Sequence, residues 1–225
     1  GSALADALIL KDGTRVEKAD MKVKDGKISR LIKIGGNTAE GTVQISQIAS
    51  LDWGDPEELT NASALLAAGK TEEAVAQLKA GKEFFAVLKD VPGNWYLDLY
   101  IAYVDALNQA GKFEDVVKTL PDLQAQKLTD QQKMKLRIMK LDIDRQTSSN
   151  YDSIVSQAED ILKETDDSTV AASLWSIIGD VYMKKKDYEQ ALLSYLRITV
   201  FYGTQVQKVP DAELRAARAL VKMKR

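Results

Sequence analysis

The hydrophobic pattern changes period once along this chain. Up to residue 53, short runs rich in Val, Ile and Leu alternate with Asp-Gly and Gly-Gly turns, as in "ALILKDG" and "ISRLIKIGGN", which is typical of β-hairpins. From residue 55 to residue 225, apolar residues recur at helical spacing. We therefore expect an α+β protein with two domains, a β domain over 1–53 and an all-α domain over 55–225.

The first region predicts four or five strands in about fifty residues. A sheet this small is most stable when it closes into a barrel, because closure hides its edges. The pattern "LKDGTRVE", "KVKDGKISRLIK" and "VQISQIASLD" resembles small SH3-like or Sm-like β-barrels. The linker after it is short, so we expect the barrel to pack against the first helices.

Several residue patterns predict where helices begin. Asp55 suits an N-cap, Pro56 the first helical position and Glu58 the capping-box carboxylate. Pro121 should kink or end the helix in which it lies. Further starts are expected at Asn94, at Thr129 with Gln132, at Asp167-Ser168 and at Pro210.

Gly69-Lys70-Thr71 matches the last three residues of a phosphate-binding loop. The full loop needs a glycine five positions before Gly69, because its backbone amides must face the phosphates, and Ala64 occupies that position. The preceding segment is rich in Ala and Leu, which favour helix over the required strand. We interpret Gly69 as a helix-ending glycine and Lys70 as a solvated turn residue.

The same joint recurs along the chain. "AAGKTEEAVAQL", "QAGKFEDVVKTL" and "KKKDYEQALLSY" share one layout, and "SSNYDSIVSQA" fits it a fourth time. The equivalent residues Thr71, Phe113, Tyr151 and Tyr188 lie 42, 38 and 37 residues apart. This spacing predicts an internal repeat of helical hairpins.

One copy carries a fuller motif, which comprises Trp175, Ile178, Gly179 and Tyr182, followed by Ala191 and Tyr195. This motif resembles the tetratricopeptide repeat (TPR), in which small residues let two helices approach and large ones fill the gaps between hairpins. The resemblance implies a helical solenoid of about four hairpins. The final segment, "VPDAELRAARALVKMKR", is expected to form a polar capping helix.

The segment "YEQALLSYLRITVFYGTQVQKVPDAELRAARAL" is also similar to the C-terminal repeats of bacterial envelope proteins of the Tol-Pal-associated CpoB type and the BamD lipoprotein type. That resemblance implies a periplasmic or exported protein. Gly1-Ser2 is typical of a cloning remnant, and we expect the native protein to carry an upstream secretory or lipoprotein leader.

The amino-acid composition limits which catalytic and binding sites the protein can have. The chain has 31 basic and 33 acidic residues, a balance that gives no general reason to expect nucleic acid as the partner. It has no Cys and no His, which excludes thiol nucleophiles, imidazole bases and the usual zinc sites. We assign no catalytic, cofactor-binding or metal-binding residues. No apolar run is long enough to span a membrane, so we expect a soluble protein without a transmembrane segment.

The TPR resemblance implies a concave groove that binds a partner protein or peptide. Asp105 and Asp180 fall at equivalent places and could receive a basic or amide-rich partner; the alternative is a solvated acidic face. Met139 and Ile143 lie on an apolar face covered either by the protein itself or by a partner. The partner-binding candidates are Asp98, Ile101, Asp105, Asn108, Met139, Ile143, Ser176, Asp180, Met183 and Lys184.

An aromatic stripe of Tyr96, Tyr100 and Tyr103 has helical spacing, and we interpret it as packing between helices.

The leading hypothesis is a non-enzymatic protein–protein interaction scaffold, with homo-oligomerisation left open. One alternative is a hydrolase that uses carboxylate pairs such as Asp55 with Glu58 or Asp166 with Asp167, although helix capping explains both pairs. The other is RNA binding through the Sm-like barrel, whose strands lack aromatic residues for base stacking.

Overall fold

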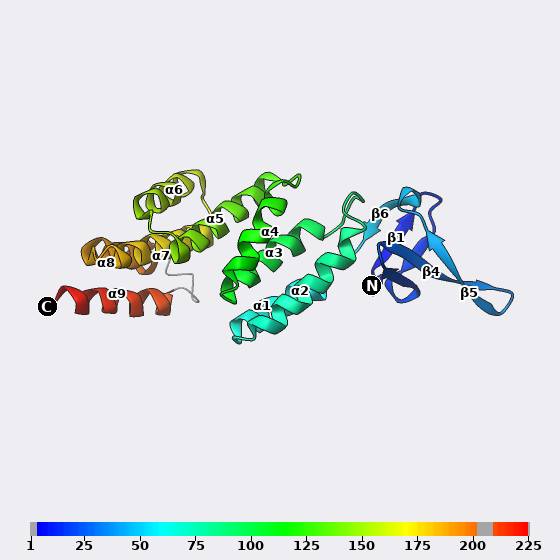
Figure 1. The fold of residues 1–225 in the computed structure, drawn as a ribbon, viewed down its shortest axis with the longest axis horizontal. Coiled ribbons are helices and arrows are strands. Elements are labelled where there is room, and N and C mark those ends of the chain that lie inside the picture. The colour runs from blue at the N-terminus through cyan, green and yellow to red at the C-terminus, as the bar shows by residue number, and fades with distance from the viewer. Residues whose placement is uncertain (1–3, 202–208, 225) are drawn as a thin grey trace. The chain divides into compact units, whose positions relative to one another are not determined.

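The computed structural model describes residues 4–201 and 209–224. Within them, six short strands come first and nine α-helices follow, as Figure 1 shows. This is the α+β layout that the sequence predicts. The chain divides into two compact units, Gly1–Gln132 and Lys133–Arg225, so the first unit contains all the strands and the second is helical.

The strands form two separate three-stranded antiparallel sheets, with the orders β2-β1-β6 and β3-β4-β5. The predicted barrel is therefore not closed. The chain leaves the first sheet through a 3-10 helix at Lys18–Asp20 and returns through another at Ile45–Gln47, so each sheet keeps its own edges. The strands are β1 Ala7–Leu10, β2 Arg15–Glu17, β3 Met21–Lys24, β4 Lys27–Ile34, β5 Asn37–Val43 and β6 Ile48–Asp52.

The turn between β3 and β4 follows the sequence rule for tight hairpins. Asp25 and Gly26 both have positive φ, 51° and 72°, as a two-residue type I′ turn requires. Lys24 pairs with Lys27 across this turn. The Asp-Gly pair therefore sets the register of the hairpin.

The β region packs against the first helices, as the short linker predicts. The Trp53 ring lies 5.6 Å from that of Phe84 and 5.4 Å from that of Phe85, and the indole Nε1–H of Trp95 donates to the Trp53 carbonyl. Gly93 has a φ of 82° and approaches the Leu51 carbonyl so closely that a Cβ would overlap it. A glycine is needed there for both reasons.

Most consecutive helices pack side by side within each unit: α1 with α2, α2 with α3 and α3 with α4 in the first, and α6 with α7, α7 with α8 and α8 with α9 in the second. The helices are α1 Glu57–Ala67, α2 Thr71–Ala86, α3 Tyr96–Gln109, α4 Phe113–Gln124, α5 Asp130–Thr147, α6 Tyr151–Glu164, α7 Ser168–Lys184, α8 Tyr188–Phe201 and α9 Val209–Met223.

Three helix joints share one backbone geometry. Gly69, Gly111 and Lys186 have φ of 74°, 71° and 62°. In each joint the N–H of this residue bonds to the carbonyl three positions back, and the next N–H bonds to the carbonyl five positions back, which is the Schellman motif. The next helix begins two residues later each time. Gly69-Lys70-Thr71 is thus the turn between α1 and α2, as predicted, and Lys70 is exposed.

Two predicted helix starts have the expected side-chain caps. Asp167 accepts hydrogen bonds from the N–H groups of Thr169 and Val170. Thr129 and Gln132 form a reciprocal capping box at the start of α5.

Other helix predictions were wrong in detail. Asp55 makes no capping bond, because α1 begins at Glu57 with Pro56 at the N-cap. Pro121 does not end its helix, because α4 continues to Gln124; a kink at Pro121, the other expected outcome, stays a prediction. Because Pro121 has no N–H, the last turn of α4 lacks one backbone hydrogen bond.

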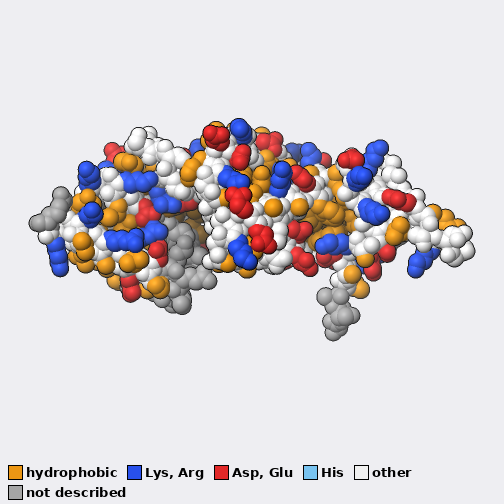
Figure 2. All heavy atoms as spheres, turned by 60° about the horizontal axis from the view of Figure 1, so that its bottom comes forward, with side chains coloured by type: hydrophobic (Ala, Val, Ile, Leu, Met, Phe, Trp, Pro, Cys, Tyr) orange, Lys and Arg blue, Asp and Glu red, His pale blue; other side chains and the backbone are white. Residues whose placement is uncertain are grey.

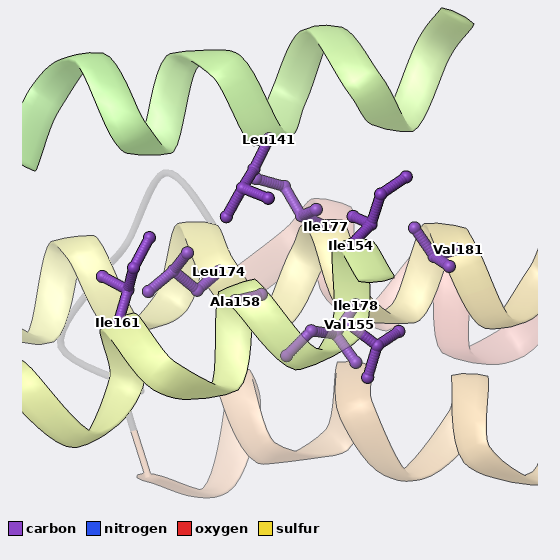
Figure 3. Packing of buried hydrophobic residues seen from close by; sticks show 9 residues of the cluster. All are labelled: Leu141, Ile154, Val155, Ala158, Ile161, Leu174, Ile177, Ile178 and Val181. Atoms are coloured by element: carbon purple, nitrogen blue, oxygen red, sulfur yellow. The ribbon is translucent and has the colours of Figure 1, made fainter. Parts of the chain in front are cut away.

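The second unit is built around an apolar core shared by α5, α6 and α7 (Figure 3). Met134 and Ile138 of α5 are half-buried against this core. The nine core residues are Leu141, Ile154, Val155, Ala158, Ile161, Leu174, Ile177, Ile178 and Val181.

Candidate functional site

In the first unit, α3 carries four of the predicted binding residues. Asp98 is half-buried and accepts a hydrogen bond from Gln132 at 3.4 Å. Asp105 is also half-buried and accepts one from Gln109 at 2.8 Å. Ile101 and Asn108 are buried, with 8% and 1% exposure. Asp98 and Asp105 are therefore the residues of this group that are accessible to a partner.

Met139 and Ile143 of α5 are buried, with exposures of 5% and 6%. Of the two interpretations of this apolar face, burial favours cover by the protein itself. On α7, Ser176 and Met183 are half-buried and Lys184 is exposed. The Lys184 ammonium donates to the Arg145 carbonyl at the end of α5.

Asp180 stands at the centre of a polar cluster that joins four helices. One carboxylate oxygen accepts from Arg145 of α5 at 2.8 Å, and Arg215 of α9 contacts both oxygens at 2.6 Å. The phenol of Tyr195 on α8 donates to Asp180 at 2.7 Å. The Asp180 side chain is 16% exposed. The negative charge of Asp180 is thus balanced by side chains of the second unit. Its carboxylate is therefore largely unavailable to a basic partner.

The two arginines of this cluster have further carboxylates. Arg145 also bonds to Asp142 at 2.8 Å, and Arg215 bonds to Asp211 at 2.9 Å. Burial alone would lower the pKa of Arg215, but the neighbouring Asp180 and Asp211 raise it. Burial, followed by the nearby Asp180 charge, raises the pKa of Tyr195 well above its ordinary value. The cluster therefore holds the Asp180 carboxylate between two guanidinium groups and a phenol that keeps its proton at neutral pH.

Sequence reasoning identified Asp180 but missed Arg145 and Arg215. Each arginine lies 35 residues from Asp180, one before it and one after it. That separation is close to the spacing of the helix joints. A comparison of equivalent positions in successive hairpins would have brought the three residues together.

The tyrosine stripe of α3 forms a second cluster, in the first unit. The Tyr100 hydroxyl donates to Asp122 of α4 at 2.7 Å. The Lys82 ammonium of α2 lies 4.5 Å from the ring of Tyr100 and 5.3 Å from that of Tyr103, within cation–π range. Burial, and then the hydrogen bond to Asp122, raise the pKa of Tyr100. The stripe thus packs between helices, as predicted, with Lys82 over its rings.

The outer side of α9 differs from the polar cap that its sequence predicts. Ala212, Ala216 and Ala219 face the protein and are buried, while Leu214 and Val221 are 52% and 70% exposed. Figure 2 shows hydrophobic side chains among Lys and Arg side chains over this part of the second unit.

No group of three or more acidic side chains is placed to hold a metal ion in the part of the chain that the structure describes. Within residues 4–201 and 209–224, no helix has the length and apolar character needed to cross a bilayer.

Comparisons with known proteins give little further information. No family model matches the chain, and no solved structure matches it. It is 39% identical over 61 residues to the intraflagellar transport protein osm-1 of Caenorhabditis elegans, a stretch that covers 27% of this chain and 4% of that protein. The chain thus spans a small fraction of this relative's length.

Proposed function

We propose that this protein is a non-enzymatic interaction scaffold whose TPR-like hairpins bind a partner protein or peptide. The single observation that carries the proposal is the Schellman joint repeated at Gly69, Gly111 and Lys186, with the next helix starting at the same offset. Repeated joints give repeated hairpins, and hairpins stacked side by side present extended surfaces suited to binding other chains.

The packing around Gly179 supports the TPR resemblance. The Tyr195 ring lies against Gly179 so closely that a Cβ there would overlap it. Trp175 is half-buried against core residues of α6 and α7 and also against Ile198 and Ala212. These small and large residues have the roles that the motif gives them, close approach within a hairpin and gap filling between neighbours.

The binding surface that we propose in each unit uses those candidates that remain accessible. In the first unit these are Asp98 and Asp105 of α3, and in the second Ser176 and Lys184 of α7. Asp180 is better described as a residue that fixes the helices behind this surface, because two arginines already bind its carboxylate.

The partner can be tested by affinity capture from extracts of the source cells, followed by mass spectrometry. We expect Asp98→Lys with Asp105→Lys to abolish capture of a partner that binds the first unit. Glu83→Lys with Asp90→Lys is the matched control, since it reverses two exposed acidic residues outside α3. Equal capture by all variants would show that the α3 surface is not the binding site.

We also propose a location in the bacterial envelope. This part of the proposal depends on the resemblance of the last two helices to CpoB-type and BamD-type proteins. Fractionation of cells that express the full native gene tests it. Recovery of the protein in the cytoplasmic fraction would contradict it, without affecting the scaffold proposal.

A further inference from the structure

One face of the β3-β4-β5 sheet carries four lysines. Side chains alternate between the two faces of a strand, and the register sets Lys22 opposite Ser29 and Lys24 opposite Lys27. Lys33 lies on the same face, two positions beyond Leu31. All four lysines are exposed, and Leu31 between them is 44% exposed.

The positive charge of this face is largely uncompensated. Among the described residues no ion pair reaches any of these lysines. Glu40 of β5 is the acidic side chain that shares the face, opposite Leu31, and its carboxylate accepts a hydrogen bond from Ser29 at 2.6 Å. Lys24 and Lys27 stand directly opposite each other, an arrangement that disfavours the hairpin. This face therefore offers net positive charge to an acidic partner.

In the same sheet, the last part of strand β4 pairs with a neighbouring strand on one side only. β4 pairs with β5 from Ile28 to Ile34, but with β3 only from Lys27 to Arg30. The segment 31–34 thus has a neighbouring strand on one side only within the described residues. Figure 1 shows the tip of the β4–β5 hairpin extending away from the other strands of the first unit. An open edge of this kind can accept an extended peptide as a further strand.

The opposite face of the overhanging hairpin is apolar. The end of the Ile32 side chain lies over Gly41, where a Cβ would overlap it, and Ile34 is 64% exposed. A peptide strand beside residues 31–34 would place its side chains alternately on the lysine face and on this isoleucine face. The two faces therefore favour a sequence in which acidic and apolar residues alternate.

We propose that the open edge of β4 at residues 31–34, with the lysine face beside it, binds an extended acidic peptide by strand addition. The peptide backbone pairs with the edge, its carboxylates meet the lysines, and its apolar residues cover Ile34. Single-stranded nucleic acid fits less well, because this face has no aromatic residue for base stacking and the edge offers backbone hydrogen bonds that suit another backbone. This site is independent of the helical surface proposed above.

The probe is a fluorescently labelled peptide of alternating Glu and Val, and the measurement is fluorescence anisotropy with the intact protein. We expect saturable binding that Lys22→Glu with Lys33→Glu weakens about tenfold or more, because two attractive contacts become repulsive. Lys79→Glu with Lys135→Glu is the control. It changes net charge equally through two exposed lysines outside the sheet and should leave the affinity unchanged.

A second peptide tests the strand geometry. N-methylation of alternate residues keeps every charge but removes the N–H groups that pair with a strand edge, so we expect it to abolish binding. Three results would overturn the proposal: no binding of the Glu-Val peptide, equal binding of the N-methylated peptide, or tighter binding of an oligouridine RNA at the same lysines.

Discussion

The aromatic ring of Tyr195 lies directly on the backbone of Gly179, where α8 packs against α7. Tyr195 is 1% exposed, and its hydroxyl reaches Asp180, the residue next to that glycine. One contact thus combines close helix approach with a hydrogen bond to the charged cluster.

Gly179→Ala should destabilise the second unit by about 1–3 kcal/mol, because the added methyl group overlaps the Tyr195 ring in a packed core. Urea unfolding followed by circular dichroism measures the change. Ser176→Ala, one turn earlier on the same helix, should shift the unfolding free energy by less than about 0.5 kcal/mol. A neutral or stabilising effect of Gly179→Ala would show that α7 and α8 do not approach as closely as described.

Asp180→Ala should cost about 2 kcal/mol, because it removes the carboxylate that two arginines and Tyr195 share. The loss stays below that of an isolated buried charge, since Asp142 and Asp211 still neutralise the arginines.

Tyr195→Phe should cost about 1 kcal/mol, the usual value of one hydrogen bond. In the double variant the two losses should not add, because the tyrosine has lost its acceptor. Asp166→Ala, at an exposed aspartate in the loop before α7, serves as the control. Strict additivity would contradict a direct Tyr195–Asp180 bond.

Stability should fall steeply at alkaline pH. Burial, with a neighbouring aspartate in each case, raises the pKa of Tyr100 and of Tyr195 above the ordinary value near 10. Above that pH the unfolded chain loses these two protons while the folded chain keeps them, so the unfolding free energy decreases as pH rises. Each tyrosine should contribute up to about 1.4 kcal/mol per pH unit.

Ultraviolet titration of phenolate absorbance checks this prediction. Of the eight tyrosines in the sequence, Tyr100 and Tyr195 should ionise only as the protein unfolds. Tyr195→Phe should reduce the dependence on pH in that range but not remove it, because the pKa values of Tyr100 and Tyr96 are also raised. Stability that stays constant between pH 10 and pH 11 would contradict the burial of both phenols.

Lys186→Gly should stabilise the protein by about 0.5–1 kcal/mol, because Lys186 has a φ of 62° in the left-handed region that favours glycine. Gly111→Ala, at the equivalent position of another joint with a φ of 71°, should destabilise by about 1 kcal/mol. Thermal unfolding of both variants tests whether the joints are equivalent. Shifts of the same sign would show that they are not.

The helix joints and caps are features that local sequence patterns could predict. Gly69 and Gly111 were predicted as turns, and Asp167 as a cap, because glycine favours a left-handed residue and a short acidic side chain satisfies free N–H groups within the same few residues. Such choices need no distant partner. The hairpins and their boundaries could accordingly be read within a few residues of their observed positions.

The barrel and the role of Asp180 are features that local sequence patterns could not predict. Turn spacing identified strands such as β1 and β4. It could not tell how the strands divide between two sheets, because strand pairing depends on contacts between distant residues. Similarly, Asp180 was identified as an inward-facing carboxylate, whereas Arg145 and Arg215 are brought to it by the packing of α5 and α9 around α7.

The sequence by itself determined the change from strands to helices, the turns at Gly69 and Gly111 and the chemistry that the lack of Cys and His excludes. These depend on periodicity, turn residues and composition, which act locally. Only the tertiary structure decided that the sheets stay separate, that the Asp180 charge is balanced internally, and that the lysines of β3 and β4 gather beside an open edge. Each of those features depends on groups far apart in the chain, whose positions are set by packing and long-range pairing.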